Sequence, residues 1–308
     1  MLIASKQVVM LYIMALVGAV ADKTGVFTEK TAKKCTDLLF YIVTPAKIIE
    51  SFLNLEYSDR ALRGLFIAIG MGLLFHLIGY FVVMPFFNKS PADDAAVFKY
   101  AAMYGNCGYM GLPLVDAVLG SEGVFYCSAV IISFQIFTFT GGIRLINYGK
   151  KDRPKINIKN IIINPGVLPV FIGLPLFILK VKMPEVISSP ISSLASLNSP
   201  LAMLIFGTYI ANTDFRLLFK EWKIWGVGAI KLIILPAIMI GLSCLFGING
   251  TLFCTLALCA ATPPANNTVM FSAKYDRSTS LASLVVAAVS LLSIVTLPAI
   301  IALTKGMC

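Results

Sequence analysis

Residues 261–276 read ATPPANNTVMFSAKYD and interrupt an otherwise apolar segment long enough to cross a membrane. Pro263 and Pro264 lack a backbone N–H and cannot continue a helix, and Asn266 and Asn267 follow them at once. Backbone polar groups cannot stay unpaired in hydrocarbon. The stretch therefore predicts a broken helix whose break is buried in protein or lines a watery cavity.

A second break of this kind lies in KYAAMYGNCGYMGLPLVDAVLG, residues 99–120. Gly108 permits unwound backbone, and Pro113 removes a donor and clashes with the preceding helical turn. We expect the break to begin at Asn106, near the middle of this segment. The chain thus carries two broken segments, one in each half.

The composition indicates a membrane protein, because 58% of the 308 residues are hydrophobic, 13% are charged and the mean hydropathy is +0.87. Soluble domains carry about 25% charged residues and cannot hide this much apolar surface. Hydropathy and helix-breaking residues together indicate ten membrane spans. We expect them at roughly 2–21, 35–55, 62–87, 99–119, 122–147, 160–180, 190–212, 223–247, 250–273 and 279–304.

Landmarks repeat between the two halves at offsets of 155 to 157 residues. They are Thr44-Pro45 with Ser199-Pro200, Asn106 with Pro263, and the turn at Gly120 with Asp276. Each half holds five spans, an odd number, so the second half enters the membrane upside down. We therefore predict an all-α fold of two inverted five-helix repeats, residues 1–150 and 151–308, with spans four and nine broken and crossed.

The distribution of lysine and arginine predicts the orientation. With ten spans, seventeen of the 25 basic residues fall on one side of the membrane and six on the other. The positive-inside rule places the first side in the cytoplasm and both termini outside the cell membrane. The net charge of +10 is then explained by topology and lipid headgroups, without nucleic acid as a partner.

Crossed broken helices bring polar groups together at the membrane midplane. Asn106 would meet Asn266 or Asn267, and two half-helix N-termini would aim their free N–H groups at one point, which suits an anion. Asparagine amides add donors that orient a carboxylate without burying an ion. The candidate binding residues are Asn106, Gly108, Pro113, Pro263, Pro264, Asn266 and Asn267, with Thr44, Asn198 and Ser199 lining the cavity.

Ionisable residues inside spans are functional candidates. Lys47 and Glu50 share a helix face and either pair with each other or leave Lys47 facing the substrate or the outer surface. Asp116 is a candidate coupling carboxylate or a local partner. His76 is a buried, hydrogen-bonded histidine or a proton carrier. Lys231 is expected to reach the cytoplasmic interface or to pair.

Enzyme and metal signatures are missing from the sequence. It contains no HExxH, GxSxG or phosphate-binding GxxxxGK[ST] motif, and a single histidine offers no zinc cluster. We expect neither catalysis, nor a metal, nor a cofactor.

NCGYMGLPL at 106–114 and ATPPANNTVMFSAKYD at 261–276 resemble the auxin efflux carrier family. The likeness extends over essentially the whole chain, and the lack of a large central loop suits compact bacterial members rather than plant PIN carriers. It implies a scaffold domain of spans one, two, six and seven, a moving transport domain of the other spans, and a homodimer. Bacterial relatives are described as malate or malonate permeases, and plant members export indole-3-acetate. Lys47 departs from the neutral residue expected there.

These observations lead to one hypothesis and two alternatives. We expect a secondary transporter or facilitator of a small organic anion, working by an elevator-type movement, with H⁺ and Na⁺ as the candidate coupling ions. A cation–proton exchanger of related fold would place carboxylates at the crossing, where this chain has amides. A ligand-sensing membrane protein would bind the anion without moving it.

Overall fold

The computed structural model describes residues 2–150, 163–212, 221–304 and 306, and within these ranges it is helical, without strands. The first half contains α1 (Leu2–Lys23), α2 (Glu29–Leu38), α3 (Thr44–Asn54), α4 (Asp59–Val83), α5 (Ala92–Met103), α6 (Leu112–Phe137) and α7 (Ile143–Ile146). The second half contains α9 (Leu168–Ile178), α10 (Glu185–Ser196), α11 (Asn198–Ala211), α12 (Lys223–Ala229), α13 (Leu235–Leu245), α14 (Gly250–Ala261), α15 (Asn267–Lys274) and α16 (Thr279–Thr304).

Within the described ranges, five helical stretches are long and apolar enough to cross a membrane. They are Asp59–Val83, Cys107–Ile146, Glu185–Ala211, Lys223–Leu245 and Thr279–Thr304. Shorter apolar helices, α9 and α14, accompany them. The prediction of an all-helical polytopic membrane protein is confirmed, whereas the ten-span inverted arrangement stays a prediction.

Turns fall where the sequence placed them, after each broken segment. Gly120 interrupts the long stretch Cys107–Ile146 with a φ of +66°, a backbone conformation that favours glycine. Asp276 has a φ of +52° between α15 and α16. The beginning of the expected span at 160–180 lies outside the described residues, as do Arg216, Lys220, Lys305 and the basic residues at 151–159.

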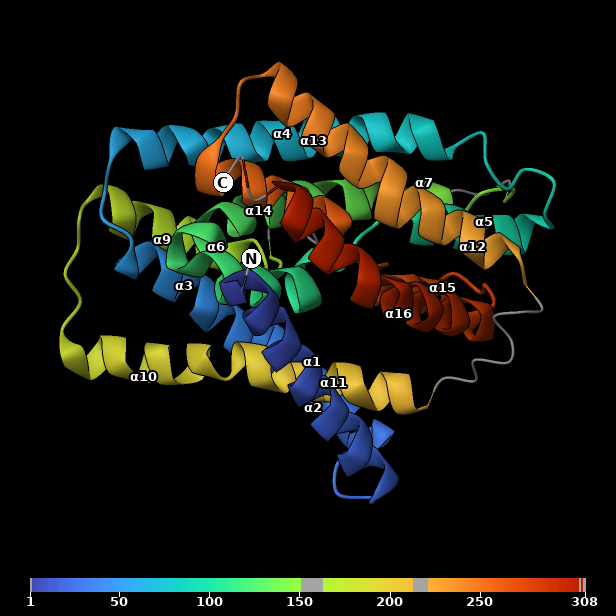
Figure 1. Cartoon of the computed structure of the whole chain (residues 1–308), viewed down its shortest axis with the longest axis horizontal. Helices are drawn as coiled ribbons and strands as arrows, with labels where there is room; N and C mark the ends of the chain where they lie inside the picture. Colours follow the sequence, from blue (N-terminus) through green and yellow to red (C-terminus); the bar gives the residue numbers. More distant parts are fainter. Residues whose placement is uncertain (1, 151–162, 213–220, 305, 307–308) are drawn as a thin grey trace.

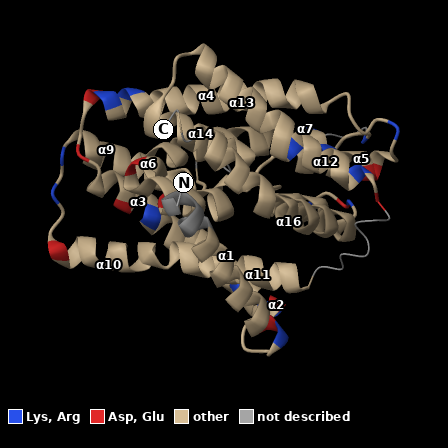
Figure 2. Ribbon diagram, viewed as in Figure 1, with Lys and Arg blue, Asp and Glu red and all other residues tan. Residues whose placement is uncertain are grey.

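The helices form two groups in space (Figure 1). α10 and α11 run along one long edge of the molecule, where α1 packs against α11 and α3 packs against α9 and α10. α4 and α13 run along the opposite edge, with α14 packed against α6 between the groups. Charged residues gather at the two ends of the long axis and on α2, with a small group at α3 (Figure 2).

π-Helical turns lie directly before prolines in three places. Leu39–Val43 precedes Pro45, Cys107–Gly111 precedes Pro113, and Ile230–Ile234 precedes Pro236. A π turn shifts the hydrogen-bond register by one residue, so it leaves room for a residue that cannot donate. The helix therefore bulges before Thr44-Pro45 and continues into α3 without a break.

The turn between α15 and α16 is tied to the first broken segment by Arg277. Its buried guanidinium donates from Nε to Ile146 O at 2.8 Å and from Nη2 to Tyr148 O at 2.7 Å. It also pairs with Asp93 at the start of α5. This clamp joins the ends of the two broken segments.

Gly207 allows the closest helix–helix approach in the first group. A Cβ built there would lie 1.8 Å from Ala15 O on α1. We expect Gly207→Val to lower the free energy of unfolding by about 3 kcal/mol, because two backbones must separate to admit the side chain. Thermal unfolding in detergent measures the loss. The control is Gly70→Ala in α4, where no atom lies within 4 Å of the built Cβ; equal stability of the two variants would contradict this packing.

Candidate functional site

The two broken segments meet backbone to backbone. α5 ends at Met103 and α14 ends at Ala261, and the chain is extended beyond each end. Asn106 N donates to Pro263 O at 2.7 Å, and Ala265 N donates to Tyr104 O at 2.9 Å. We call Tyr104–Asn106 with 262–266 the crossing. Its antiparallel pairing satisfies backbone groups that the broken helices leave without partners.

Four helix ends converge at the crossing. α5 and α14 arrive with their C-termini, while the helical turns starting at Cys107 and Asn267 leave with their N-termini. Asn106 caps the first departing helix, because its Oδ1 accepts from Tyr109 N at 3.2 Å. Asn266 occupies the same position before α15 without a side-chain cap bond. Helix N-termini carry partial positive charge, so the side of the crossing where these two helices begin suits an anion.

The break in the first segment ends at Asn106, whereas the sequence suggested that it begins there. Gly108 and Pro113 lie in the helix that follows, where the π-helical turn Cys107–Gly111 accommodates the missing donor of Pro113. The extended residues are instead Tyr104 and Gly105, which carry no helix-breaking proline. Tyr104 and Gly105 stay extended because they pair with the second break, at Pro263 and Pro264.

A cavity of about 390 Å³ reaches the crossing from one side. Asn106, Asn266 and Tyr109 contribute its polar surface near the crossing. Most of its walls are apolar, from Met110, Met203, Ile205, Phe206, Val269 and Met270. Ligand sites of small molecules commonly combine such walls with a few placed polar groups.

Lys33 and Glu29 at the start of α2 border the same cavity. They form an exposed ion pair at 2.9 Å. The hydrogen bond that Lys33 donates to Glu29 raises the pKa of the lysine. The two charges offset each other at the border of the cavity.

A smaller cavity of about 30 Å³ touches the crossing elsewhere. Thr44, Gly108 and Asn267 line it together with Asn106, so the structure brings these four predicted residues together. Gln135 of α6 also lines it, and its buried Oε1 has no hydrogen-bond partner among the described residues. Sequence reasoning missed Gln135, although an amide in the middle of the apolar run at 122–147 was the available signal.

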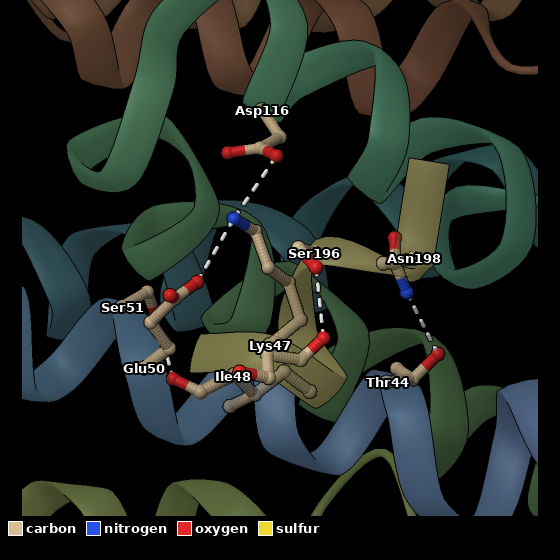
Figure 3. A network of polar contacts seen from close by, with 9 residues as sticks. Thr44, Lys47, Ile48, Glu50, Ser51, Asp116, Ser196 and Asn198 are labelled. Carbon is tan, nitrogen blue, oxygen red and sulfur yellow. Dashed lines mark hydrogen bonds and ion pairs between the residues drawn. The ribbon is translucent and has the colours of Figure 1, made fainter. Parts of the chain in front are cut away.

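Lys47 lies at the centre of a separate polar network (Figure 3). From α3 its Nζ reaches Glu50 Oε2 at 3.1 Å and Asp116 Oδ2 of α6 at 3.0 Å. Among the described residues that line the two cavities at the crossing, none belongs to this triad. The pairing of Lys47 with Glu50 was one of the expected alternatives, and Asp116 completes it from another helix.

Thr44 contacts one of the two site residues predicted near its repeat position in the second half. Asn198 Nδ2 donates to Thr44 Oγ1 at 3.2 Å across the two halves of the chain (Figure 3). Asn198 therefore supports Thr44, and it does not appear among the described residues that line either cavity at the crossing. Ser199 is likewise not among them.

His76 and Lys231 lie next to the crossing at Gly105 and are not among the described residues that line either cavity. His76 Nδ1 donates to Gly72 O at 2.6 Å, and its ring stacks on Tyr104 and Phe137. Lys231 is 1% exposed and donates to Ala260 O at 3.0 Å. It neither reaches the surface nor pairs with a carboxylate in the part of the chain that the structure describes, so the expectation for Lys231 was wrong.

Comparison with known proteins places this arrangement among transporters. A family profile described as membrane transport protein matches residues 3–161 and 154–301. An uncharacterized transporter of Methanocaldococcus jannaschii is 24% identical over 286 residues, which cover 87% of this chain and 88% of the relative. A putative malonate transporter of Rhizobium meliloti is 25% identical over 279 residues, covering 87% and 85% of the two chains. An uncharacterized transporter of Escherichia coli is 22% identical over 277 residues, 86% of each chain.

Proposed function

The chain belongs to the membrane transport protein family, as its resemblance to auxin efflux carriers implied, and from this premise we propose that it carries a small organic anion across the cytoplasmic membrane. It would act as a secondary transporter or facilitator. The anion would bind at the crossing, where Asn106 and Asn266 present amides beside two helix N-termini.

One observation carries this proposal: the two breaks are hydrogen-bonded to each other, and a cavity ends on both of their asparagines. Unwound backbone inside a membrane protein is tolerated where it is buried or lines a cavity. The amides donate without bringing a buried charge, so the crossing favours an anion over a sodium ion or a proton.

The substrate we propose is a mono- or dicarboxylate such as malate, malonate or an auxin-like acid. One relative is named a putative malonate transporter, and the cavity of about 390 Å³ falls in the size range of small-molecule sites. Its apolar walls suit the carbon skeleton of the acid, while the crossing receives a carboxylate.

The movement we propose is an elevator-type exchange of access between two inverted repeats, residues 1–150 and 151–308. The scaffold would hold α1, α2, α3, α9, α10 and α11, and the transport domain would hold the remaining helices. In this division the Lys47–Asp116 pair joins α3 of the scaffold to α6 of the transport domain, and the large cavity reaches the crossing beside α2. Both termini would face outside, Asp116 would couple transport to H⁺ or Na⁺, and two copies would form a dimer.

Uptake into proteoliposomes tests the proposal. Labelled malate, malonate, succinate, lactate and indole-3-acetate are offered with and without an imposed proton gradient, and empty liposomes serve as the control. We expect saturable uptake of at least one acid. Saturable binding without uptake would instead indicate a sensor, and sodium flux without any acid would indicate a cation–proton exchanger.

A further inference from the structure

Lys231 is a buried cation that forms no ion pair among the described residues. It lies in the π-helical turn Ile230–Ile234 between α12 and α13, and no carboxylate of the described residues lies within salt-bridge distance of it. Its Nζ donates to Ala260 O and lies 6.0 Å from the centre of the Phe75 ring. Charges inside a membrane protein are costly and generally mark a functional pathway.

Its position relative to the crossing is defined by Gly105. A Cβ built on Gly105 would lie 2.5 Å from Thr262 Oγ1 and 2.7 Å from Lys231 Nζ, so the ammonium group packs directly against this glycine. Gly105 and Cys107 line a void of about 10 Å³ together with Lys231, whereas Asn106 between them faces the large cavity. Lys231 and the large cavity therefore adjoin neighbouring residues of the same short stretch of chain.

The contacts of Lys231 account for its hydrogen bond but leave its charge uncompensated. Ala260 O belongs to the last turn of α14, where a helix carries only partial negative charge. A neutral amide could donate to that carbonyl equally well. The ionisable groups around the ammonium are His76, Cys107 and Cys259, none of which is a carboxylate.

We propose that Lys231 is the fixed counter-charge of the transported anion and determines the preference for charged over uncharged ligands. The inference rests on the proposed function and adds a residue that never touches the substrate. Lys231 acts through the Gly105–Asn106 backbone, so it is a specificity-determining and positioning residue.

The size of the effect follows from electrostatics. At an effective dielectric constant of about 20, a unit charge at a separation of about 8 Å changes the affinity for a monoanion about 30-fold, and this is the order of effect we expect. An uncharged ligand of the same shape gains nothing from the ammonium. Loss of the charge therefore lowers affinity for acids selectively, whereas a purely structural defect lowers affinity for both ligands alike.

The test compares an acid with its amide in wild type and Lys231→Gln. The probe is the acid that wild type takes up fastest, measured by its own uptake, and its uncharged amide competes for that uptake (malonate with malonamide, indole-3-acetate with indole-3-acetamide). We expect Lys231→Gln to weaken the acid about 30-fold or more and the uncharged amide by less than about threefold. Lys231→Arg is expected to keep most of the preference.

Lys99→Gln is the matched control, because Lys99 is equally buried but bonds Met84 O and Asn88 Oδ1, away from the crossing. Lys231→Met serves as a second neutral variant where Lys231→Gln does not fold. Equal weakening of acid and amide, or no change in either, would overturn the role of Lys231. Absence of uptake of every acid by wild type would overturn the proposed function instead, so the two failures are distinguishable.

Discussion

Lys47→Asp is expected to lower the free energy of unfolding by about 3 kcal/mol or more and to reduce transport to below a tenth of wild type. The change brings three carboxylates together where Lys47 now bridges Glu50 and Asp116 (Figure 3). The three side chains are 11%, 14% and 26% exposed, so water screens their repulsion poorly. Breaking a buried ion pair by removing one partner costs about 3–5 kcal/mol. Thermal unfolding in detergent and proteoliposome uptake measure the two effects.

The reversed pair, Lys47→Asp with Asp116→Lys, separates attraction from other effects of the mutations. It restores one cation between two carboxylates, so we expect most of the stability and transport to return. The matched control is Lys33→Asp, which reverses one member of the exposed pair with Glu29 and is expected to cost less than about 1 kcal/mol. A double variant no more stable than Lys47→Asp would show that the pair does not join α3 to α6.

The sequence carried the information for the breaks because helix breaking is local. Pro263 and Pro264 remove two donors in succession, and no tertiary contact can return them. The first break was placed a few residues late, since it lies at Tyr104 and Gly105, whose own preferences do not exclude a helix. Their extended conformation depends on pairing with the other break, an interaction between residues 157 to 161 positions apart.

The contacts of the charged residues inside the helices depend on partners from other helices, which sequence spacing cannot reveal. Lys47 and Glu50 are three residues apart, so their pairing was predictable from helix geometry. Asp116 reaches Lys47 from another helix, and the ammonium group of Lys231 packs directly against Gly105. Lys231 does not reach the membrane interface as expected, because its whole side chain is buried inside the protein.

Asn106→Asp is expected to reduce anion uptake to below about a hundredth of wild type while leaving the protein folded. Asparagine and aspartate are nearly isosteric, and both cap a helix through Oδ1, which here accepts from Tyr109 N. The substitution therefore keeps the cap and replaces the amide donor with a negative charge at the proposed anion site. Removing a donor and adding like-charge repulsion together exceed the roughly 2.7 kcal/mol that corresponds to a hundredfold loss.

The most direct test of the central claim is saturable uptake of the preferred acid by wild type and Asn106→Asp, with thermal unfolding of both measured in the same detergent. The account predicts unfolding temperatures within a few degrees of each other and uptake lost in the variant, because the crossing itself binds the anion. Undiminished uptake by a folded Asn106→Asp protein would contradict it and would place the anion away from the crossing.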